Sequence, residues 1–199
     1  MTHSPKSRKS LIILIILSCF LIPWFAARWL YHHHLPMHGT QHGTLITPPF
    51  SLHTVTWTPV RTNLHETALP EHQWLLLYFY PAHCGIVCRH DWHFLGQIQK
   101  SLGKDQKRVG RILIVYPETP LTTDQRRALT TTPIQLQLRA VNPLPWHRLM
   151  QNHFPTIPAK GTIFISDPHG NVILMYPPYT RMEYIRKDLQ KLLELSQIG

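Results

Sequence analysis

The hydrophobic positions of this chain fall into continuous runs, which are typical of buried strands, and into spaced stripes, which are typical of helices. Residues 74–80, WLLLYFY, form a continuous apolar run bounded by Gln73 and Pro81, as expected of a strand that is buried on both faces. Residues 87–102 carry apolar side chains near helical spacing and end before Gly103, which predicts a helix. The sequence therefore predicts a central strand that leads through a short loop into a helix.

Further runs and stripes predict an alternating order of strands and helices. Helices are expected at 122–129, 144–154 and 181–196, a hairpin turn at 167–171, and strands or extended segments at 50–60, 111–116, 134–138, 162–166 and 172–176. A right-handed crossover through the first helix joins parallel strands, and the hairpin adds antiparallel strands to the same sheet. The expected fold class is therefore α/β, with a thioredoxin-like fold.

The N-terminal pattern is different. Residues 11–27, LIILIILSCFLIPWFAA, contain no charge, and the apolar character continues around one arginine, which predicts a transmembrane helix at 11–31. Basic residues precede the run, so the positive-inside rule makes residues 1–10 a cytoplasmic tail and sends the domain across the membrane. A cleaved signal peptide is the alternative, since Ala26 and Ala27 offer small side chains to a peptidase, but the run is longer than a usual signal core.

The composition of the remaining chain indicates a linker followed by one domain. Residues 32–49 are rich in histidine, glycine and proline without a hydrophobic period, which is typical of a linker, and residues 50–199 are long enough for one domain. The linker histidines could collect copper or zinc, or could form an ordinary polar segment at the membrane interface. The net charge of +10 favours contact with anionic lipid or an acidic protein surface. The exported topology argues against a nucleic-acid partner.

The candidate reactive site is the pair Cys84 and Cys88. These are the only thiols of the predicted domain, because Cys19 lies in the apolar N-terminal run. They stand where the central strand turns into a helix, and a helix N-terminus stabilises the thiolate that attacks disulfides or binds metal. The flanking His83 and His90 add protonatable groups.

Three roles are open to this pair. It could exchange disulfides, with Cys84 as the attacking thiol and Cys88 as the resolving thiol. Reduced, it could bind a soft ion such as Cu(I). It could also be a passive disulfide, although a bridge that closes so short a loop stabilises little.

Two motifs carry a family resemblance. Residues 74–103 place Cys-x-x-x-Cys between an apolar strand and a helix, and residues 162–176 place an Asp-Pro-x-Gly turn between two strands. The chain from about residue 44 to 198 thereby resembles the Sco/SenC copper chaperones. It is most similar to small Sco-like membrane proteins encoded beside cytochrome c oxidase genes, which share stretches like His42–Pro49 and Leu102–Asp105.

The resemblance implies a single-pass inner-membrane protein with a thioredoxin-like domain in the periplasm. It implies a role in cytochrome c oxidase assembly by thiol–disulfide exchange or copper handling, with an oxidase subunit or assembly factor as partner. The protein would be a thiol–disulfide oxidoreductase or a metallochaperone rather than a conventional enzyme. A non-catalytic scaffold that binds an assembly partner is the alternative.

Copper is the candidate metal, but one ligand of the family is missing. In the Sco family a histidine shortly before the Asp-Pro turn completes the copper site, whereas this chain has Ala159 there, eight residues before Asp167. The candidate substitutes for the third ligand are His153, His83 and His90.

Overall fold

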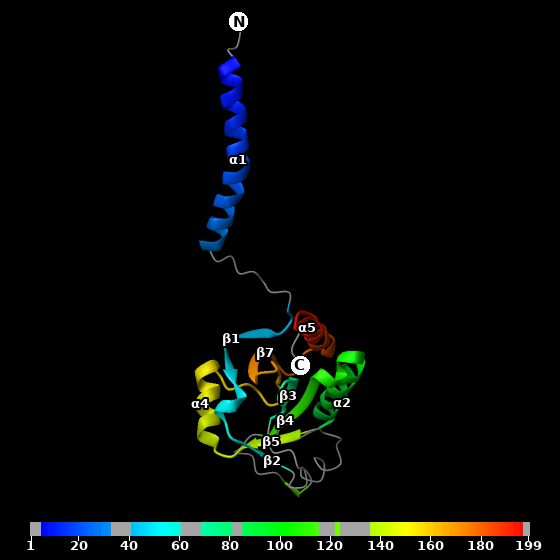
Figure 1. The fold of residues 1–199 in the computed structure, drawn as a ribbon. Coiled ribbons are helices and arrows are strands. Elements are labelled where there is room, and N and C mark those ends of the chain that lie inside the picture. The colour runs from blue at the N-terminus through cyan, green and yellow to red at the C-terminus, as the bar shows by residue number, and fades with distance from the viewer. Residues whose placement is uncertain are drawn as a thin grey trace. The chain divides into compact units, whose positions relative to one another are not determined.

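The protein is described by a computed structural model, which defines residues 5–32, 41–60, 69–80, 85–115, 122–123 and 136–196. The chain divides into two compact units, Met1–Thr40 and Gln41–Gly199. Figure 1 shows a long helix in the first unit and a sheet with helices packed on it in the second.

The first unit contains helix α1, Pro5–His32, with Pro23 in its interior. The structure describes the side chains of α1 only from Ile15 onwards. Within the described part of the chain, no helix is long and apolar enough to cross a membrane. The predicted helix over residues 11–31 is therefore confirmed, and its membrane-spanning role stays a prediction.

The second unit is built on one mixed sheet. In chain order its strands are β1 (Thr44–Ser51), β2 (Trp57–Pro59), β3 (Trp74–Tyr80), β4 (Val109–Val115), β5 (Leu136–Ala140), β6 (Ile163–Ser166) and β7 (Asn171–Tyr176). They lie side by side in the order β1-β7-β6-β3-β4-β5-β2. The β3–β4 and β4–β5 pairs are parallel, and the β3–β6 and β6–β7 pairs are antiparallel. The expected crossover unit and hairpin are therefore confirmed.

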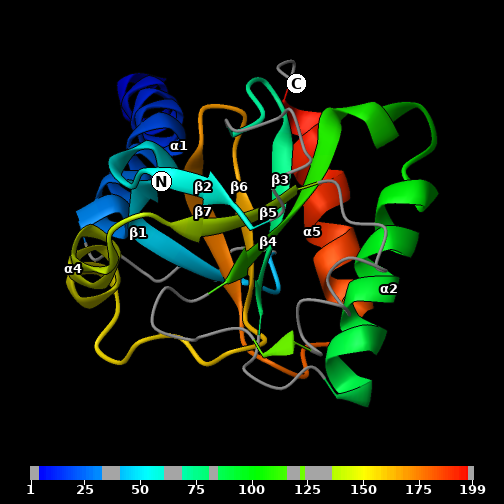
Figure 2. The ribbon, with the colours of Figure 1, turned by 90° about the horizontal axis from the view of Figure 1, so that it is seen from below.

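Helices cover both faces of this sheet. They are α2 (Ile86–Ser101), α4 (Pro143–His153) and α5 (Met182–Leu195), with short 3-10 helices η1 (Leu52–Thr54) and η2 (Gly103–Arg108). Figure 2 shows α2 and α5 together on one side of the sheet and α4 on the other. Alternate side chains of β3 enter the two hydrophobic clusters, for example Tyr78 beside α2 and α5, and Phe79 beside α4. The α/β arrangement and the central position of β3 agree with the sequence analysis.

The structure corrects the predicted linker and the segment after it. Strand β1 begins at Thr44, inside the predicted linker 32–49, and contains Pro48 and Pro49. Proline lacks the N–H of a ladder hydrogen bond, but β1 is an edge strand with an irregular register, where that loss is tolerated. The predicted strand at 50–60 is divided between the end of β1 and β2, which lie at opposite edges of the sheet. Most of the predicted helix 122–129 lies outside the described residues.

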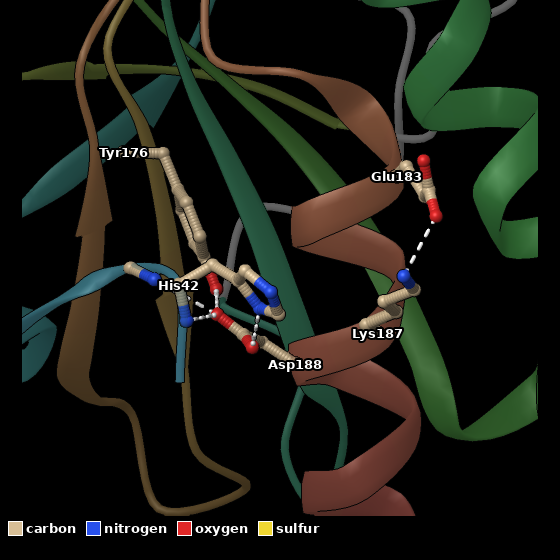
Figure 3. A network of polar contacts seen from close by, with 6 residues as sticks. His42, Tyr176, Glu183, Lys187 and Asp188 are labelled. Atoms are coloured by element: carbon tan, nitrogen blue, oxygen red, sulfur yellow. Dashed lines mark hydrogen bonds and ion pairs between the residues drawn. The ribbon is translucent and has the colours of Figure 1, made fainter. Parts of the chain in front are cut away.

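A buried carboxylate ties the beginning of the second unit to α5. Asp188 accepts hydrogen bonds from the backbone N–H groups of His42 and Gly43 and from the hydroxyl of Tyr176, each at 2.8 Å. The His42 Nδ1 atom lies 2.9 Å from the other carboxylate oxygen (Figure 3). The His42 ring also stacks on the Tyr184 ring. Burial opposes ionisation of Asp188, but these hydrogen bonds outweigh it and lower its pKa.

Replacing this carboxylate should therefore destabilise the domain. Because Asp188→Ala leaves buried donors without an acceptor, we expect the free energy of unfolding to fall by about 3–5 kcal/mol at neutral pH. The folded-state pKa of Asp188 is lowered, so its contribution is complete above the unfolded pKa and is lost as pH falls through the folded pKa. Denaturant unfolding at neutral pH and below pH 4 measures this. The free energies of unfolding of the parent and Asp188→Ala should differ at neutral pH and become similar in acid.

The matched control is Glu183→Gln on the same helix. Glu183 and Lys187 form an exposed ion pair of 2.7 Å, drawn beside the buried network in Figure 3. Exposed pairs of this kind contribute little, so the control should unfold like the parent. Equal effects of the two substitutions would show that the Asp188 network does not hold the domain together.

Candidate redox site

The candidate site lies between the end of β3 and the start of α2. Gly85 precedes the helix and offers no side-chain cap, and the first turn contains no acidic residue. The Arg89 N–H donates to the Gly85 carbonyl oxygen at 3.2 Å, which begins the helical hydrogen bonding. The positive end of the α2 dipole is therefore not neutralised by a side chain from its own first turn, and it favours negative charge at Cys88.

Cys88 is the third residue of α2 and forms a disulfide bond. Its side chain is 4% exposed and belongs to the hydrophobic cluster between the sheet, α2 and α5. Cys19 is free. Cys84 and His83, the other predicted residues of this loop, lie outside the described residues.

A buried carboxylate follows Cys88 on the same helix. Asp91 comes three residues after Cys88, so both side chains lie on the buried face of α2. Asp91 is 7% exposed and accepts a hydrogen bond of 3.3 Å from the Tyr78 hydroxyl. Its other oxygen lies 3.6 Å from His90 Nδ1. Burial raises the pKa of Asp91, and the contacts with His90 and Tyr78 only partly offset this.

Tyr78, the hydroxyl donor to this carboxylate, lies in a buried aromatic environment. The pKa of Tyr78 is raised by burial and by the nearby Asp91. Trp92 packs 6.3 Å from the Tyr78 ring, and the Arg111 guanidinium lies 5.0 Å from the Trp92 ring centre. Arg111 also donates to Gln99 at 2.9 Å. The surroundings are thus largely apolar, which makes a charge at Asp91 costly.

Sequence reasoning missed Asp91 and Tyr78. One signal was present, because Asp91 is the only carboxylate in the sequence of α2 and comes one turn after a cysteine. The partner on β3 could not be found from spacing, since Tyr78 reads as one more apolar position in a buried run.

Two of the predicted histidine ligands, His153 and His90, lie within the described residues. His153 ends α4, where its ring packs 5.2 Å from Phe50 and its Nδ1 lies 2.9 Å from the Leu149 carbonyl oxygen. That is the opposite face of the sheet from Cys88. His90 is mostly exposed on α2, with its ring 4.4 Å from Phe94. Among the described residues, no three His, Cys, Asp or Glu side chains could hold a metal ion together.

The segment that follows Ala159, the position where the Sco resemblance expects a histidine, is hydrogen-bonded to the end of β3. The Gly161 N–H donates to the Phe79 carbonyl oxygen at 2.7 Å, and the Phe79 N–H donates to Thr162 at 3.0 Å. These bonds hold the segment after Ala159 against the end of β3. The Ala159 carbonyl oxygen accepts from the Thr162 hydroxyl at 2.6 Å, but its methyl side chain cannot bind copper. The described residues therefore do not complete a three-ligand copper site.

Solved structures with the same fold are distant in sequence. Apo Sco1 from Thermus thermophilus has 20% identity and a TM-score of 0.53, covering 79% of this chain and 99% of its own. BsSco, a member of the Sco family of cytochrome c oxidase assembly proteins, has 15% identity and a TM-score of 0.51, covering 78% and 98%. At these identities the likeness shows the α/β thioredoxin-like fold alone.

The copper-bound structures have lower TM-scores. Arabidopsis thaliana ScoI with copper bound has 13% identity and a TM-score of 0.48, covering 63% of this chain and 87% of its own. Structural relatives thus bind copper, but this likeness is too weak to support an argument about the present chain. No curated protein matches the sequence.

One family model covers most of the domain. It is described as the transmembrane-like, thioredoxin-like, C-terminal domain, and it matches residues 74–196. The match runs from β3 through the candidate redox site to the end of α5 and takes in more than half of the chain. This chain therefore belongs to the transmembrane-like, thioredoxin-like, C-terminal domain family.

Proposed function

We propose that this protein is a membrane-anchored, Sco-like thiol–disulfide exchange protein that assists cytochrome c oxidase assembly through Cys84 and Cys88. One observation carries the proposal: Cys88 is disulfide-bonded in the first turn of α2, at the end of the central strand. Because Cys19 is free and the sequence contains three cysteines, we assign Cys84 as its partner.

The reduced pair would act on a disulfide of the partner protein. The Cys84 thiolate attacks one partner sulfur, so the Cys84–partner bond forms, the partner disulfide breaks and its other sulfur leaves as a thiolate. Cys88 then loses its proton and attacks the Cys84 sulfur, which forms the Cys84–Cys88 bond and releases the first partner sulfur. The partner gains two electrons and two protons, and the pair becomes oxidised.

We assign Asp91 as the group that accepts the proton of Cys88. The Cys88 side chain is 4% exposed, so its proton has little direct access to water. Asp91 comes one turn after Cys88 on the buried face of α2, and burial raises its pKa, which makes the carboxylate a better proton acceptor. His90, which lies 3.6 Å from Asp91 and is mostly exposed, joins this carboxylate to solvent.

The proposed location rests on the sequence of the first unit. Residues 11–27 contain no charge, and described apolar side chains of α1 such as Phe20 and Ile22 are exposed. We propose that α1 anchors the protein in the inner membrane, with the N-terminus in the cytoplasm and the domain in the periplasm. An oxidase subunit or assembly factor would be the partner. Copper, where it is handled, would be cargo.

A scaffold without chemistry is the second candidate. Ala159 favours it, because the position next to the end of β3 that would complete a copper site has no ligand. In that role the domain would bind an assembly partner, and the disulfide would be static. The redox potential of the cysteine pair separates the two functions.

An exchanging pair should equilibrate with glutathione buffers at a potential between about −300 and −180 mV, whereas a structural disulfide stays oxidised below about −300 mV. We expect the redox potential of the cysteine pair in the full chain to lie in the exchanging range, as measured by alkylation of free thiols and mass spectrometry. A host strain carrying Cys84→Ser and Cys88→Ser should have less assembled oxidase, and Cys19→Ser is the control. A pair that stays oxidised, together with normal oxidase in the double variant, would contradict the proposal.

Restoring the missing ligand should convert the site towards copper binding. We expect Ala159→His to raise the Cu(I) affinity of the reduced full chain at least about tenfold, because a third soft or borderline ligand joins two thiolates. Competition with a Cu(I) chelator measures the change. His153→Ala is the control and should leave the affinity unchanged, since His153 lies on the opposite face of the sheet. No gain in Ala159→His would place residue 159 outside the thiol site.

Asp91→Asn should stabilise the domain while slowing its chemistry. The fold favours the protonated carboxyl, so this contribution is present below the unfolded pKa and is lost as pH rises through the raised folded pKa. At pH 7 the parent therefore carries the cost of a buried charge that Asn lacks, and the variant should melt about 2–4 °C higher. The difference should vanish near pH 3.

The same variant should close the Cys84–Cys88 disulfide more slowly in stopped-flow oxidation. Asp91→Glu should keep most of the rate because it keeps the carboxylate. An unchanged rate in Asp91→Asn would remove Asp91 from the proton path without affecting the assignment of the cysteines.

A further inference from the structure

Aromatic and basic side chains gather where the chain enters the second unit. The His42 ring stacks on the Tyr184 ring, with the ring centres 4.4 Å apart. The Arg181 guanidinium lies 5.3 Å from the centre of the same Tyr184 ring. Tyr184 thus joins the first residues of the unit to the start of α5 in one cluster.

Two further side chains extend this cluster with exposed apolar surface. Tyr179, two residues before Arg181, is 82% exposed, and Leu45 is 57% exposed. Leu45 pairs with Leu174 across β1 and β7, and paired residues of antiparallel strands point to the same face of a sheet. Leu174 belongs to the hydrophobic cluster that α5 covers, so Leu45 lies on the α5 side. We define the entry face as His42, Leu45, Tyr179, Arg181 and Tyr184.

Tyr179 holds an unfavourable backbone conformation in this face. Its φ is 68°, a value that glycine adopts freely and that bulky residues rarely adopt. The turn is closed by the Thr180 N–H and hydroxyl, which donate to the Pro177 carbonyl oxygen at 3.3 Å and 2.6 Å. Because the Tyr179 side chain is exposed, packing in the core does not account for a tyrosine at this position. A backbone outlier of this kind points to a role at the surface.

The helix that carries part of this face has an excess of positive charge. From Arg181 to Ser196 four cationic side chains are exposed or half-buried and two carboxylates are exposed: Arg181, Arg186, Lys187 and Lys191, against Glu183 and Glu194. One carboxylate serves two cations, because Glu183 lies 2.7 Å from Lys187 and 3.7 Å from Arg181. The Arg181 side chain is nevertheless 70% exposed. This surface is complementary to one that combines negative charge with apolar groups.

The connection to α1 limits how far this face can lie from the proposed anchor. Helix α1 ends at His32, and the second unit begins at Gln41. The eight residues between them span at most about 30 Å when fully extended. His42 follows this connection directly and is part of the entry face. In the proposed location, a lipid surface is therefore always within reach of the face.

We propose that the entry face docks on the anionic headgroup layer of the membrane that holds α1. The inference rests on the proposed anchoring and goes beyond it, because it assigns the side of the domain that meets the lipid. Tyrosine and arginine suit such a layer, since each has an apolar body and a polar end. An acidic protein would match the charge as well, but the short connection to the anchor favours lipid.

The test identifies the residues that approach lipid headgroups. The isotope-labelled full chain is placed in nanodiscs of phosphatidylcholine, with or without phosphatidylglycerol, and some lipids carry a nitroxide on the headgroup. The nitroxide broadens nuclear magnetic resonance signals of nearby residues. We expect broadening at residues 42–45 and 179–184 in the anionic discs, weaker broadening in the zwitterionic discs, and a decrease as salt rises. Residues 143–153 of α4, on the other side of the sheet, should stay sharp.

Two variants separate the charge of the face from its aromatic surface. Arg181→Glu should lower the docking equilibrium in anionic discs at least about fivefold, because each cation near an anionic surface contributes about that factor. Tyr179→Gly should weaken broadening in both kinds of disc without lowering the melting temperature, since glycine tolerates the positive φ. The matched controls on α4 are Arg148→Glu and Leu144→Asn, whose parent side chains are exposed. Both controls should behave like the parent.

Broadening that is absent, even over the whole domain or confined to α4 would overturn the docking proposal and leave the anchoring and the thiol chemistry intact. A full chain that does not enter nanodiscs when detergent is removed would instead overturn the proposed anchoring. Signals of the entry face that shift with protein concentration, and do not respond to the nitroxide, would assign the face to a second copy of the chain and overturn the docking on lipid.

Discussion

The structure depends on one constraint, the complete burial of β3 on both faces and along both edges. Trp74 to Tyr80 pair with β4 on one side, and Leu75 to Tyr78 pair with β6 on the other. The side chains of β3 alternate between two hydrophobic clusters. A strand buried in this way has its register fixed by its neighbours, because a shift of one residue would exchange the two sets of side chains. The start of α2 is therefore held at one end of the strand, and the segment after Ala159 is held there as well through its bonds to Phe79. The chemistry of the site therefore depends on the side chains at the start of α2 and in the segment around Ala159.

Two buried aspartates show how surroundings decide the role of a carboxylate. Asp188 has several donors aimed at it, including backbone N–H groups, and its pKa falls although burial opposes this. Asp91 has one hydroxyl and a more distant imidazole, and its pKa rises. The first group is a structural connection between the start of the domain and α5. The second carries an uncompensated cost, and such a cost is typical of residues kept for function rather than for stability.

Much of this arrangement could be predicted from the sequence because it rests on local patterns. The continuous run of β3, the helical stripe of α2 and the turn at Asp167 each specify an element without reference to the rest of the chain. The strand β1 could not be predicted, since Pro48 and Pro49 argue against a strand unless its place at the sheet edge is known. The position of His153 on the opposite face of the sheet from Cys88 could not be predicted either, because it depends on the side of the sheet that α4 covers. Spacing identified Cys88, but it could not show that Tyr78 points towards Asp91.

Two features of the site bear on the choice between metal handling and the proposed exchange with a protein. Ala159 stands near the end of β3 where the Sco resemblance expects a metal-binding histidine, while Ile86 and Val87 place exposed apolar side chains between the cysteines in the sequence. A metal site gains from polar, rigid ligands that surround the ion, and neither feature provides one. A site that acts on another protein gains instead from apolar contact area beside the reacting sulfur and from charges that select the partner. The exposed side chains of Ile86 and Val87 supply apolar contact area, so they agree better with the proposed exchange with a protein than with the retention of an ion.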